Sequence, residues 1–399
     1  MAGDNARPMS PCASEPHEPL PQAEWLQEGT PHRARWRSEA NRPPPPRISC
    51  VDDTLTADKA FRLACEGTAL LWQGDFHNAR QLLQALSRRV DRKPRKAGPS
   101  GVESPAQVFH RHRQAQGRRA AILGMLLVPL DGGFRIPLRR APDVSAACEE
   151  AWGPPEGHPS VVALRELLGL LGAHEWRRRG VEVPALGNPP GNRIHPHYGV
   201  FSPVRGEYLD LIAAQPLPAP CPLAWDIGTG TGVIAAVLAR RGVSRVLATD
   251  TSPRALACAR DNIDRLGLDA RVDLMQADLF PPGRAPLIVC NPPWLPARPT
   301  SPLEHAVYDA DSAMLRGFLD GASVRLEPQG EAWLILSDFA EHLGLRTREQ
   351  LLGWITGGGL TVRGRQDVRP RHGKASDPDD PLATARSREI TSLWRLGAA

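Results

Sequence analysis

Residues 291–294, Asn-Pro-Pro-Trp, have the chemistry needed to hold a planar amino group. Proline has no backbone N–H, so the carbonyl groups around Pro292 and Pro293 are free to accept hydrogen bonds from a ligand. The side-chain oxygen of Asn291 is a second acceptor, and two neighbouring acceptors match the two hydrogens of an –NH2 group. Trp294 adds a flat face on which an amide or a base can stack. The loop can therefore present an amino nitrogen, lone pair outward, to an electrophile.

This loop follows a short apolar run, Leu-Ile-Val-Cys at 287–290, that has the composition of a buried strand. The loop is thus expected at the carboxyl end of a strand, where open α/β sheets bind their ligands. A proline-stiffened turn without a chemical role is the alternative, because the chain contains 41 prolines. Motifs upstream favour the binding site.

A glycine-rich turn lies upstream, between an apolar strand at 223–227 and an apolar helix at 233–241. The turn, residues 228–232, reads Gly-Thr-Gly-Thr-Gly, and its glycines let the backbone approach a ligand closely. Its spacing is G-x-G-x-G and not the G-x-G-x-x-G of NAD-binding proteins. By itself this turn fits several cofactors.

The next predicted strand, residues 245–249, ends in Asp250. This aspartate comes 22 residues after Gly228. An acidic residue at about that distance is placed to bind the two hydroxyl groups of a ribose.

Another strand is predicted at 272–276, and Asp278 follows it. Its carboxylate can accept a hydrogen bond from an adenine amino group while Leu279 and Phe280 cover the ring. Each aspartate alone is better explained as a helix cap or a turn residue. Ligand positions after four successive strands, the last at Asn291, predict together a cofactor that contains adenosine.

As a set, four runs resemble the class I S-adenosylmethionine-dependent methyltransferases with a small methyltransferase domain, and closely the HemK-type protein-glutamine methyltransferases. The runs are DIGTGTGVIA at 226–235, TSPRALACARDNIDRLGL at 251–268, QADLF at 276–280 and LIVCNPPWLP at 287–296. The resemblance covers about residues 195–340.

The resemblance implies S-adenosyl-L-methionine as cofactor and a Rossmann-like seven-stranded sheet that ends in an antiparallel pair. In that family the glycine-turn positions hold the methionine part of the cofactor, and the two later aspartates hold its ribose and adenine. The cofactor-binding residues so implied are Asp226, Gly228, Thr229, Gly230, Gly232, Asp250, Asp278 and Leu279. The substrate nitrogen is assigned to Asn291, Pro292, Pro293 and Trp294, the last of which is often Tyr or Phe in the family.

Residues 195–208 precede the first strand of this fold, where related enzymes have a segment that folds over the cofactor. Pro203 to Glu207, Pro-Val-Arg-Gly-Glu, is a partial match to the Pro-Arg-Pro-Glu-Thr-Glu run of the HemK type. We hypothesise that Phe201 and Arg205 line the cofactor site.

The implied reaction is an in-line displacement in which the protein mainly positions the nucleophile. Holding two reactants in a near-attack geometry can contribute up to about 7–11 kcal/mol. The transition state does not require a strong general base. We therefore assign no catalytic role to the nearby His305 and Asp309.

Several acceptors are compatible with the loop. The motifs favour a macromolecular acceptor, specifically a glutamine side-chain amide in a translation-related protein. The alternative is the exocyclic amine of adenine or guanine in RNA or DNA. A non-catalytic cofactor-binding module and a small-molecule amide substrate are less favoured.

The segment 80–120 bears on the nucleic-acid alternative, because it contains eleven Lys and Arg residues and two acidic residues. Such a cluster can bind RNA or a ribosomal surface. A solvated linker explains it equally well, since residues 94–104 are rich in Pro, Gly and Ser.

Composition along the chain predicts three parts. Residues 1–47 are a Pro-rich tail that we expect to be disordered. Residues 50–190 are expected to form a mostly helical auxiliary domain for substrate recognition, with helices near 57–71, 79–90, 105–127 and 159–177 and a short strand at 134–138. Residues 195–399 form the methyltransferase domain. The sequence does not indicate the oligomeric state.

No targeting or membrane segment is evident, because the first 20 residues lack an apolar core and no apolar run approaches the roughly 20 residues needed for a bilayer. Seven cysteines show no C-x-x-C pair and no spacing typical of metal ligands. These features predict a cytoplasmic protein with reduced thiols and no metal site. The net charge is a modest +5.

Overall fold

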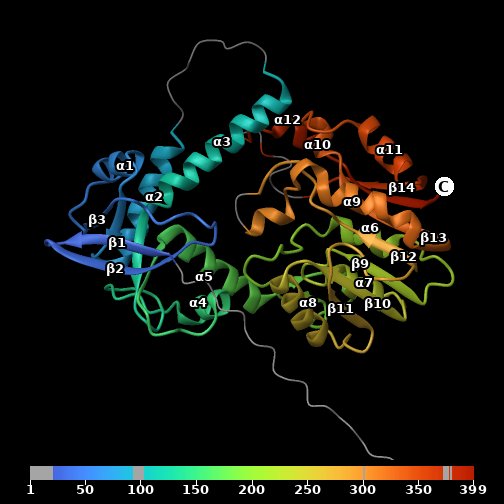
Figure 1. The fold of residues 1–399 in the computed structure, drawn as a ribbon, viewed down its shortest axis with the longest axis horizontal. Helices are drawn as coiled ribbons and strands as arrows, with labels where there is room; N and C mark the ends of the chain where they lie inside the picture. Colours follow the sequence, from blue (N-terminus) through green and yellow to red (C-terminus); the bar gives the residue numbers. More distant parts are fainter. Residues whose placement is uncertain (1–20, 93–102, 300–301, 372–376, 378–379) are drawn as a thin grey trace, which may run out of the picture.

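The computed structural model describes residues 21–92, 103–299, 302–371, 377 and 380–399. The chain folds into two lobes, each built around its own β-sheet (Figure 1). The C-terminal lobe contains the motifs described above. The N-terminal lobe packs beside it across a central hollow.

The C-terminal lobe contains a seven-stranded sheet in the order β11-β10-β9-β12-β13-β15-β14. Its strands are β9 (Leu223–Ile227), β10 (Arg245–Asp250), β11 (Val272–Gln276), β12 (Ala285–Cys290), β13 (Leu326–Ser337), β14 (Leu360–Val368) and β15 (Thr391–Ala398). The first five are parallel, whereas β15 runs antiparallel to both β13 and β14. The predicted Rossmann-like sheet with a final antiparallel pair is confirmed.

Both faces of this sheet are buried, and the central strands show why. Every residue of β12 is buried. Leu287 and Val289 pack with the helices of one face, and Ile288 and Cys290 pack with those of the other. A parallel strand covered on both faces needs apolar residues at every position, which explains the unbroken apolar run in the sequence.

Seven α-helices of this lobe lie in the described residues. They are α6 (Glu207–Ala214), α7 (Val233–Arg240), α8 (Pro253–Arg265), α9 (Ala313–Ala322), α10 (Phe339–His342), α11 (Arg348–Gly357) and α12 (Ala383–Arg386). Helix α5 (Leu164–Arg179) precedes them and packs in the core of the N-terminal lobe. Helices α6 and α7 cover one face of the sheet, and α9 and α11 cover the other. A two-stranded pair, β7 (Val181–Glu182) with β8 (Arg193–Ile194), lies between the lobes in sequence.

The N-terminal lobe is built on a six-stranded sheet in the order β1-β2-β6-β5-β4-β3. Its strands are β1 (Gln22–Gln27), β2 (Thr30–Arg37), β3 (Ile48–Val51), β4 (Ala69–Trp72), β5 (Leu126–Leu130) and β6 (Ser160–Ala163). The other helices of this lobe are α1 (Ala57–Cys65), α2 (Phe76–Val90), α3 (Pro105–Leu123) and α4 (Ser145–Trp152). The predicted helices are present, but this sheet was not expected.

The unexpected strands are short, and this explains why periodicity did not find them. Residues 69–72 are fully apolar, and a run of four cannot be assigned to a strand or a helix by spacing alone. Residues 159–177 were predicted as one helix, but β6 occupies their first part and α5 the rest. The strand predicted at 134–138 is instead a turn, in which Asp131 accepts hydrogen bonds from the backbone of Gly133 and Arg135.

The prediction that residues 1–47 are disordered is wrong for residues 22–37, which form β1 and β2. Three apolar side chains on this hairpin, Ala23, Ala34 and Trp36, are buried against the sheet. Two alanines and one tryptophan among charged residues give a weak apolar signal, although they suffice to anchor the hairpin. Residues 1–20 lie outside the described part of the chain.

No helix among the described residues is long and apolar enough to span a bilayer. Within the same residues, no group of three or more His, Cys, Asp or Glu side chains is arranged to hold a metal ion.

Asn262 of α8 joins the linker between the lobes to the glycine turn. Its side chain is fully buried, accepts a hydrogen bond from the backbone N–H of His195 at 2.7 Å and donates to the carbonyl groups of Thr231 and Cys258. A single side chain thus satisfies three backbone groups that have no access to water.

Replacement of Asn262 by alanine would remove the side-chain partner of the His195 N–H and of the Thr231 carbonyl. We expect Asn262→Ala to lower the free energy of unfolding by about 2–3 kcal/mol. Denaturant titration measures this change. The matched control is Asn78→Ala, which removes a surface hydrogen bond to Asp53 and should change stability by less than about 0.5 kcal/mol. Equal effects of the two substitutions would contradict the prediction.

Candidate active site

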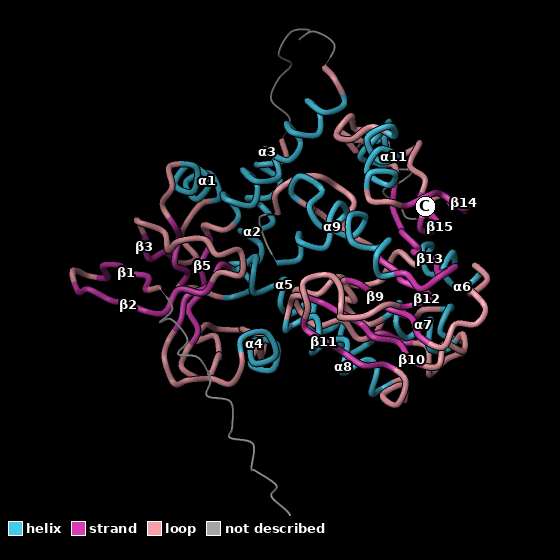
Figure 2. The backbone as a smooth tube through the Cα atoms, turned by 45° about the vertical axis from the view of Figure 1, so that its right-hand side comes forward, coloured by secondary structure: helices cyan, strands magenta, loops and turns pink. Residues whose placement is uncertain are grey.

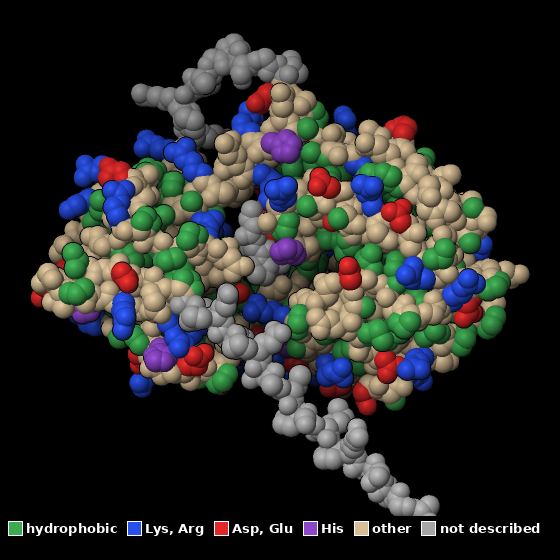
Figure 3. All heavy atoms as spheres, in the orientation of Figure 1, with side chains coloured by type: hydrophobic (Ala, Val, Ile, Leu, Met, Phe, Trp, Pro, Cys, Tyr) green, Lys and Arg blue, Asp and Glu red, His purple; other side chains and the backbone are tan. Residues whose placement is uncertain are grey.

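A cavity of about 1450 Å³ lies at the carboxyl edge of the C-terminal sheet, between the two lobes. The surface is hollowed at this place in Figure 3. The cavity is lined by the glycine turn, by the ends of β10 and β12, and by residues 38–41 of the N-terminal lobe.

Strand register puts three ligand positions side by side at this edge. Thr249 of β10 and Cys290 of β12 both lie level with Ile227 of β9. One residue further along each strand are Asp250, Gly228 and Asn291. Because neighbouring strands are about 4.8 Å apart, the aspartate and the asparagine flank the glycine turn at roughly 10 Å from each other.

The glycine turn is left-handed at its first residue and lies close to a side chain of α9. Gly228 has a φ of +73°, and a Cβ atom there would lie 2.5 Å from the methyl carbon of Met314. The backbone N–H groups of Gly228 and Thr229 donate to the carbonyl of Thr249 at 2.9 and 2.8 Å. The turn is thereby tied to the end of β10, and its open side faces the cavity.

Asp226 lies beneath this turn and is fully buried. Its carboxylate accepts hydrogen bonds from the Thr229 hydroxyl at 2.7 Å and from the backbone N–H of Ala235 at 3.0 Å. Burial raises the pKa of Asp226 to about 7, although these two hydrogen bonds act in the opposite direction. The sequence grouped Asp226 with the cofactor contacts, but in the structure this residue acts on the turn and on the start of α7.

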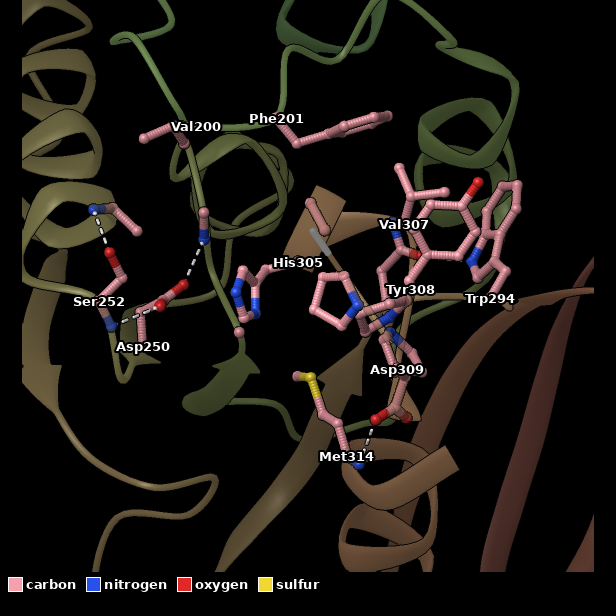
Figure 4. Close-up of a pocket in the computed structure, with 18 of the residues that line it drawn as sticks. Val200, Phe201, Asp250, Ser252, Trp294, His305, Val307, Tyr308, Asp309 and Met314 are labelled. Carbon is pink, nitrogen blue, oxygen red and sulfur yellow. Dashed lines mark hydrogen bonds between the residues drawn. The ribbon is translucent and has the colours of Figure 1, made fainter. Parts of the chain in front are cut away.

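Asp250 lines the cavity on the other side of the turn. One carboxylate oxygen accepts from the backbone N–H of Gly230 at 3.0 Å and the other from that of Ser252 at 2.9 Å (Figure 4). Each oxygen keeps a lone pair that a ligand hydroxyl can use. The carboxylate is therefore oriented before any ligand arrives.

The turn after β11 brings Asp278 and Leu279 to the same cavity. Asp278 is exposed, and the hydroxyl of Thr249 donates to the carbonyl of Leu279 at 2.6 Å, which holds the turn in place. Phe280 does not cover the cavity as the sequence suggested. Its ring stacks on Phe318 of α9 with centroids 5.9 Å apart.

All four residues of the Asn-Pro-Pro-Trp loop line the cavity. The indole N–H of Trp294 donates to the side-chain oxygen of Asn291 at 2.9 Å. Because an indole nitrogen can only donate, this bond determines which end of the Asn291 amide carries the oxygen. The predicted flat face of Trp294 is present, and the ring also packs against the core on both sides of the sheet.

The loop continues into a backbone clamp. The N–H of Leu295 donates to Val307 at 3.2 Å, and the N–H of Asp309 donates back to Leu295 at 2.8 Å. The Asp309 carboxylate then accepts from the backbone N–H groups of Met314 and Leu315 at the start of α9. Burial raises the pKa of Asp309.

Phe201 and Arg205 both line the cavity, as hypothesised. Phe201 is exposed, and Figure 4 shows its ring above the cavity, directed toward the Val307 side. Arg205 lies 4.0 Å from the buried carboxylate of Glu389, which precedes β15. His305 also lines the cavity and is exposed.

The sequence did not anticipate the wall that comes from the N-terminal lobe. Ser38, Glu39 and Asn41 line the cavity, and the Glu39 carboxylate pairs with Arg254 of α8 at 3.3 Å. These residues fall in the stretch that was predicted to be disordered, so no signal in the sequence pointed to them. Tyr308 was also missed, although it lies only 14 residues after Trp294.

Comparison with known proteins agrees with this arrangement. Residues 191–347 match the family described as "Methyltransferase small domain". A release factor glutamine methyltransferase of Moorella thermoacetica is 36% identical over 152 residues, which are 32% of this chain and 53% of that protein. Its counterpart in Cereibacter sphaeroides is 36% identical over 196 residues, 46% of this chain and 65% of that protein.

The chain therefore spans between about half and two thirds of the length of these relatives. A solved structure, the ribosomal protein L11 methylase from Lactobacillus delbrueckii subsp. bulgaricus, is 17% identical, with a TM-score of 0.31 over 45% of this chain and 72% of that one. The family match and the two relatives confirm the resemblance to S-adenosylmethionine-dependent methyltransferases of the HemK type.

The raised pKa of Asp226 predicts how stability depends on pH. In the unfolded chain this group ionises near pH 4, whereas in the folded protein it ionises at about 7. Its contribution to the free energy of unfolding is therefore full below about pH 4 and is lost as the pH rises to about 7. Asp226→Asn cannot ionise at this position. The free energy of unfolding of this variant, relative to wild type, should therefore increase as the pH rises from about 4 to about 7.

Denaturant titrations of both proteins, without ligand, across about pH 4–8 measure the difference. A difference that stays constant over this range would contradict the assignment.

Proposed function

We propose that this protein is an S-adenosylmethionine-dependent N-methyltransferase whose acceptor is a glutamine side-chain amide in a peptide-chain release factor. The observation that carries the proposal is the register that places Asn291 and Asp250 on either side of Gly228 at one cavity. One cavity can thus hold both the methyl donor and the –NH2 group that accepts the methyl.

The residues present fit the cofactor. The two oxygens of Asp250 are oriented by backbone N–H groups and match the two hydroxyls of a ribose. The glycine turn leaves room for the methionine part, and Asp278 and Leu279 line the same cavity, where the carboxylate of Asp278 can accept from an adenine amino group. When bound, S-adenosylmethionine supplies a methyl group on a sulfonium, which is already activated for transfer.

The acceptor loop performs the protein's part of the chemistry. The free lone pair of the Asn291 oxygen and a carbonyl at Pro292 accept the two amide hydrogens and turn the nitrogen lone pair toward the methyl group. Orientation of this kind, and not proton abstraction, lowers the barrier. The methylated nitrogen would then release its extra proton to water, and the donor would leave as the neutral thioether. Asp309 is not a base in this scheme, since both its oxygens are bound to the start of α9.

Two observations favour a protein acceptor over a nucleic acid. Both relatives described above are named for a glutamine in release factors. In addition, four arginines of the basic segment form ion pairs within the protein, which partly neutralise the charge that a phosphate backbone would meet. These are Arg89 with Asp58, Arg111 with Glu103, Arg113 with Glu304 and Arg119 with Asp91.

The direct test uses S-adenosylmethionine with a labelled methyl group and lysate from cells that lack this protein. We expect label in a release factor, in a form that survives RNase and is released by protease. Asn291→Ala should bind the cofactor normally in calorimetry and lose at least about a hundredfold in turnover, because in this scheme its oxygen contacts the methyl acceptor and not the cofactor. Label removed by RNase alone would reject the glutamine acceptor.

A second prediction concerns the bond between Trp294 and Asn291. Trp294→Phe keeps an aromatic ring and removes the N–H, so the Asn291 amide can rotate, and we expect kcat to fall about tenfold. Asn291→Asp has an acceptor oxygen at both positions and does not depend on this orientation. In that background, Trp294→Phe should lower kcat much less. Equal losses in both backgrounds would show that the bond has no orienting role.

A further inference from the structure

Helix α3 begins on the C-terminal lobe and ends in the N-terminal lobe (Figures 1 and 2). It has 19 residues and is therefore about 28 Å long. At its carboxyl end, Leu123 is buried in the core of the N-terminal lobe, and Arg119 pairs with Asp91 after α2 at 2.8 Å. This end of the helix is fixed to one lobe.

The amino end of α3 is fixed to the other lobe. Phe109 is 1% exposed, although the polar residues around it give α3 little apolar character. Its ring is buried in a cluster supplied by the C-terminal lobe, which includes Leu295, Phe339, Leu343, Leu382 and Ala385. Leu295 directly follows the Asn-Pro-Pro-Trp loop.

Arg113 lies one turn further along the same face of α3. Its guanidinium carbon lies 3.9 Å from the centroid of the Tyr308 ring. One of its nitrogens donates to the carbonyl of Arg298 at 2.9 Å and reaches the Glu304 carboxylate at 3.4 Å. A single side chain, 19% exposed, thus contacts three points on the segment 295–309.

That segment determines where the acceptor loop lies. Tyr308 and Leu295 form a parallel bridge, flanked by the two backbone hydrogen bonds of the clamp. The next residue, Asp309, binds the start of α9, and Met314 of α9 lies against Gly228. A displacement of Tyr308 would therefore move the acceptor loop, whereas the backbone of the glycine turn is held separately by its hydrogen bonds to Thr249.

We propose that α3 is a strap through which the N-terminal lobe positions the acceptor loop, and that Arg113 is the positioning residue. The expected loss of turnover rests on the proposed function. The expected loosening of the acceptor loop does not. A planar guanidinium can stack on an aromatic ring and bond a carbonyl at its edge simultaneously, which an ammonium group cannot do. Lysine at position 113 would therefore keep the positive charge but could not stack on Tyr308 and bond the carbonyl of Arg298 at the same time.

The test compares Arg113→Lys with Arg118→Lys, a control at an exposed position of the same helix. Hydrogen exchange reports on the loop without requiring any reaction. In Arg113→Lys we expect faster exchange in residues 291–309 and unchanged exchange in the glycine turn and in β9. Calorimetry should give a cofactor Kd within about twofold of wild type, because no cofactor contact is altered.

Kinetics are measured with a purified release factor and S-adenosylmethionine as probes. We expect kcat to fall about 10- to 100-fold in Arg113→Lys and to be unchanged in Arg118→Lys, because a small misplacement of reacting groups slows the chemical step. Wild-type exchange in residues 291–309 would overturn the inference. Faster exchange throughout the C-terminal lobe, with weaker cofactor binding, would also overturn it, since Arg113 would then act only on stability.

If wild-type protein transfers no methyl group to the release factor, the proposed function fails. A local increase in exchange in Arg113→Lys would still support the strap in that case.

Discussion

Parallel pairing of β10, β9 and β12 is the constraint on which the site depends. Parallel strands end at the same edge of a sheet, so the loops that follow them must emerge together. Asp250, Gly228 and Asn291 are level with one another for this reason, although 63 residues separate the first of them in sequence from the last. Helices α7 and α8 return the chain to the opposite edge after β9 and β10, and the connection at 277–284 does so without a helix after β11.

The sequence predicted the C-terminal lobe well because buried parallel strands leave a strong signal. The strand predicted at 223–227 is β9, in which four of five residues are buried, and the apolar run at 287–290 lies in β12, which is buried throughout. In the N-terminal lobe, strands of four or five residues gave no such signal, and Glu39 lies in a stretch that looked disordered. Contacts such as the bond from Trp294 to Asn291 depend on how a loop folds back on itself, which neither spacing nor composition records.

Support of the site is divided between groups that meet the ligand and groups that do not. Asp226 was expected to contact the cofactor, but it shapes the glycine turn from below and is shielded from water. Asp309 similarly joins the acceptor loop to α9 through its backbone and its carboxylate. Each of these carboxylates is held by two donors: Asp226 through one oxygen, and Asp309 through both. By contrast, the exposed Asp278 and the half-buried Asp250 line the cavity, where a ligand can contact them.

The position of β15 has a consequence for synthesis of the protein on the ribosome. Residues 391–398 are inserted between β13 and β14, and Leu393 and Trp394 pack on opposite faces of the sheet. Strands β9 to β12 emerge much earlier, so they can pair with one another while the sheet still lacks an interior strand. Until residue 391 has left the ribosome, β13 and β14 expose unpaired edges that can pair with other nascent chains. Emergence of β15 therefore removes an aggregation hazard of this lobe.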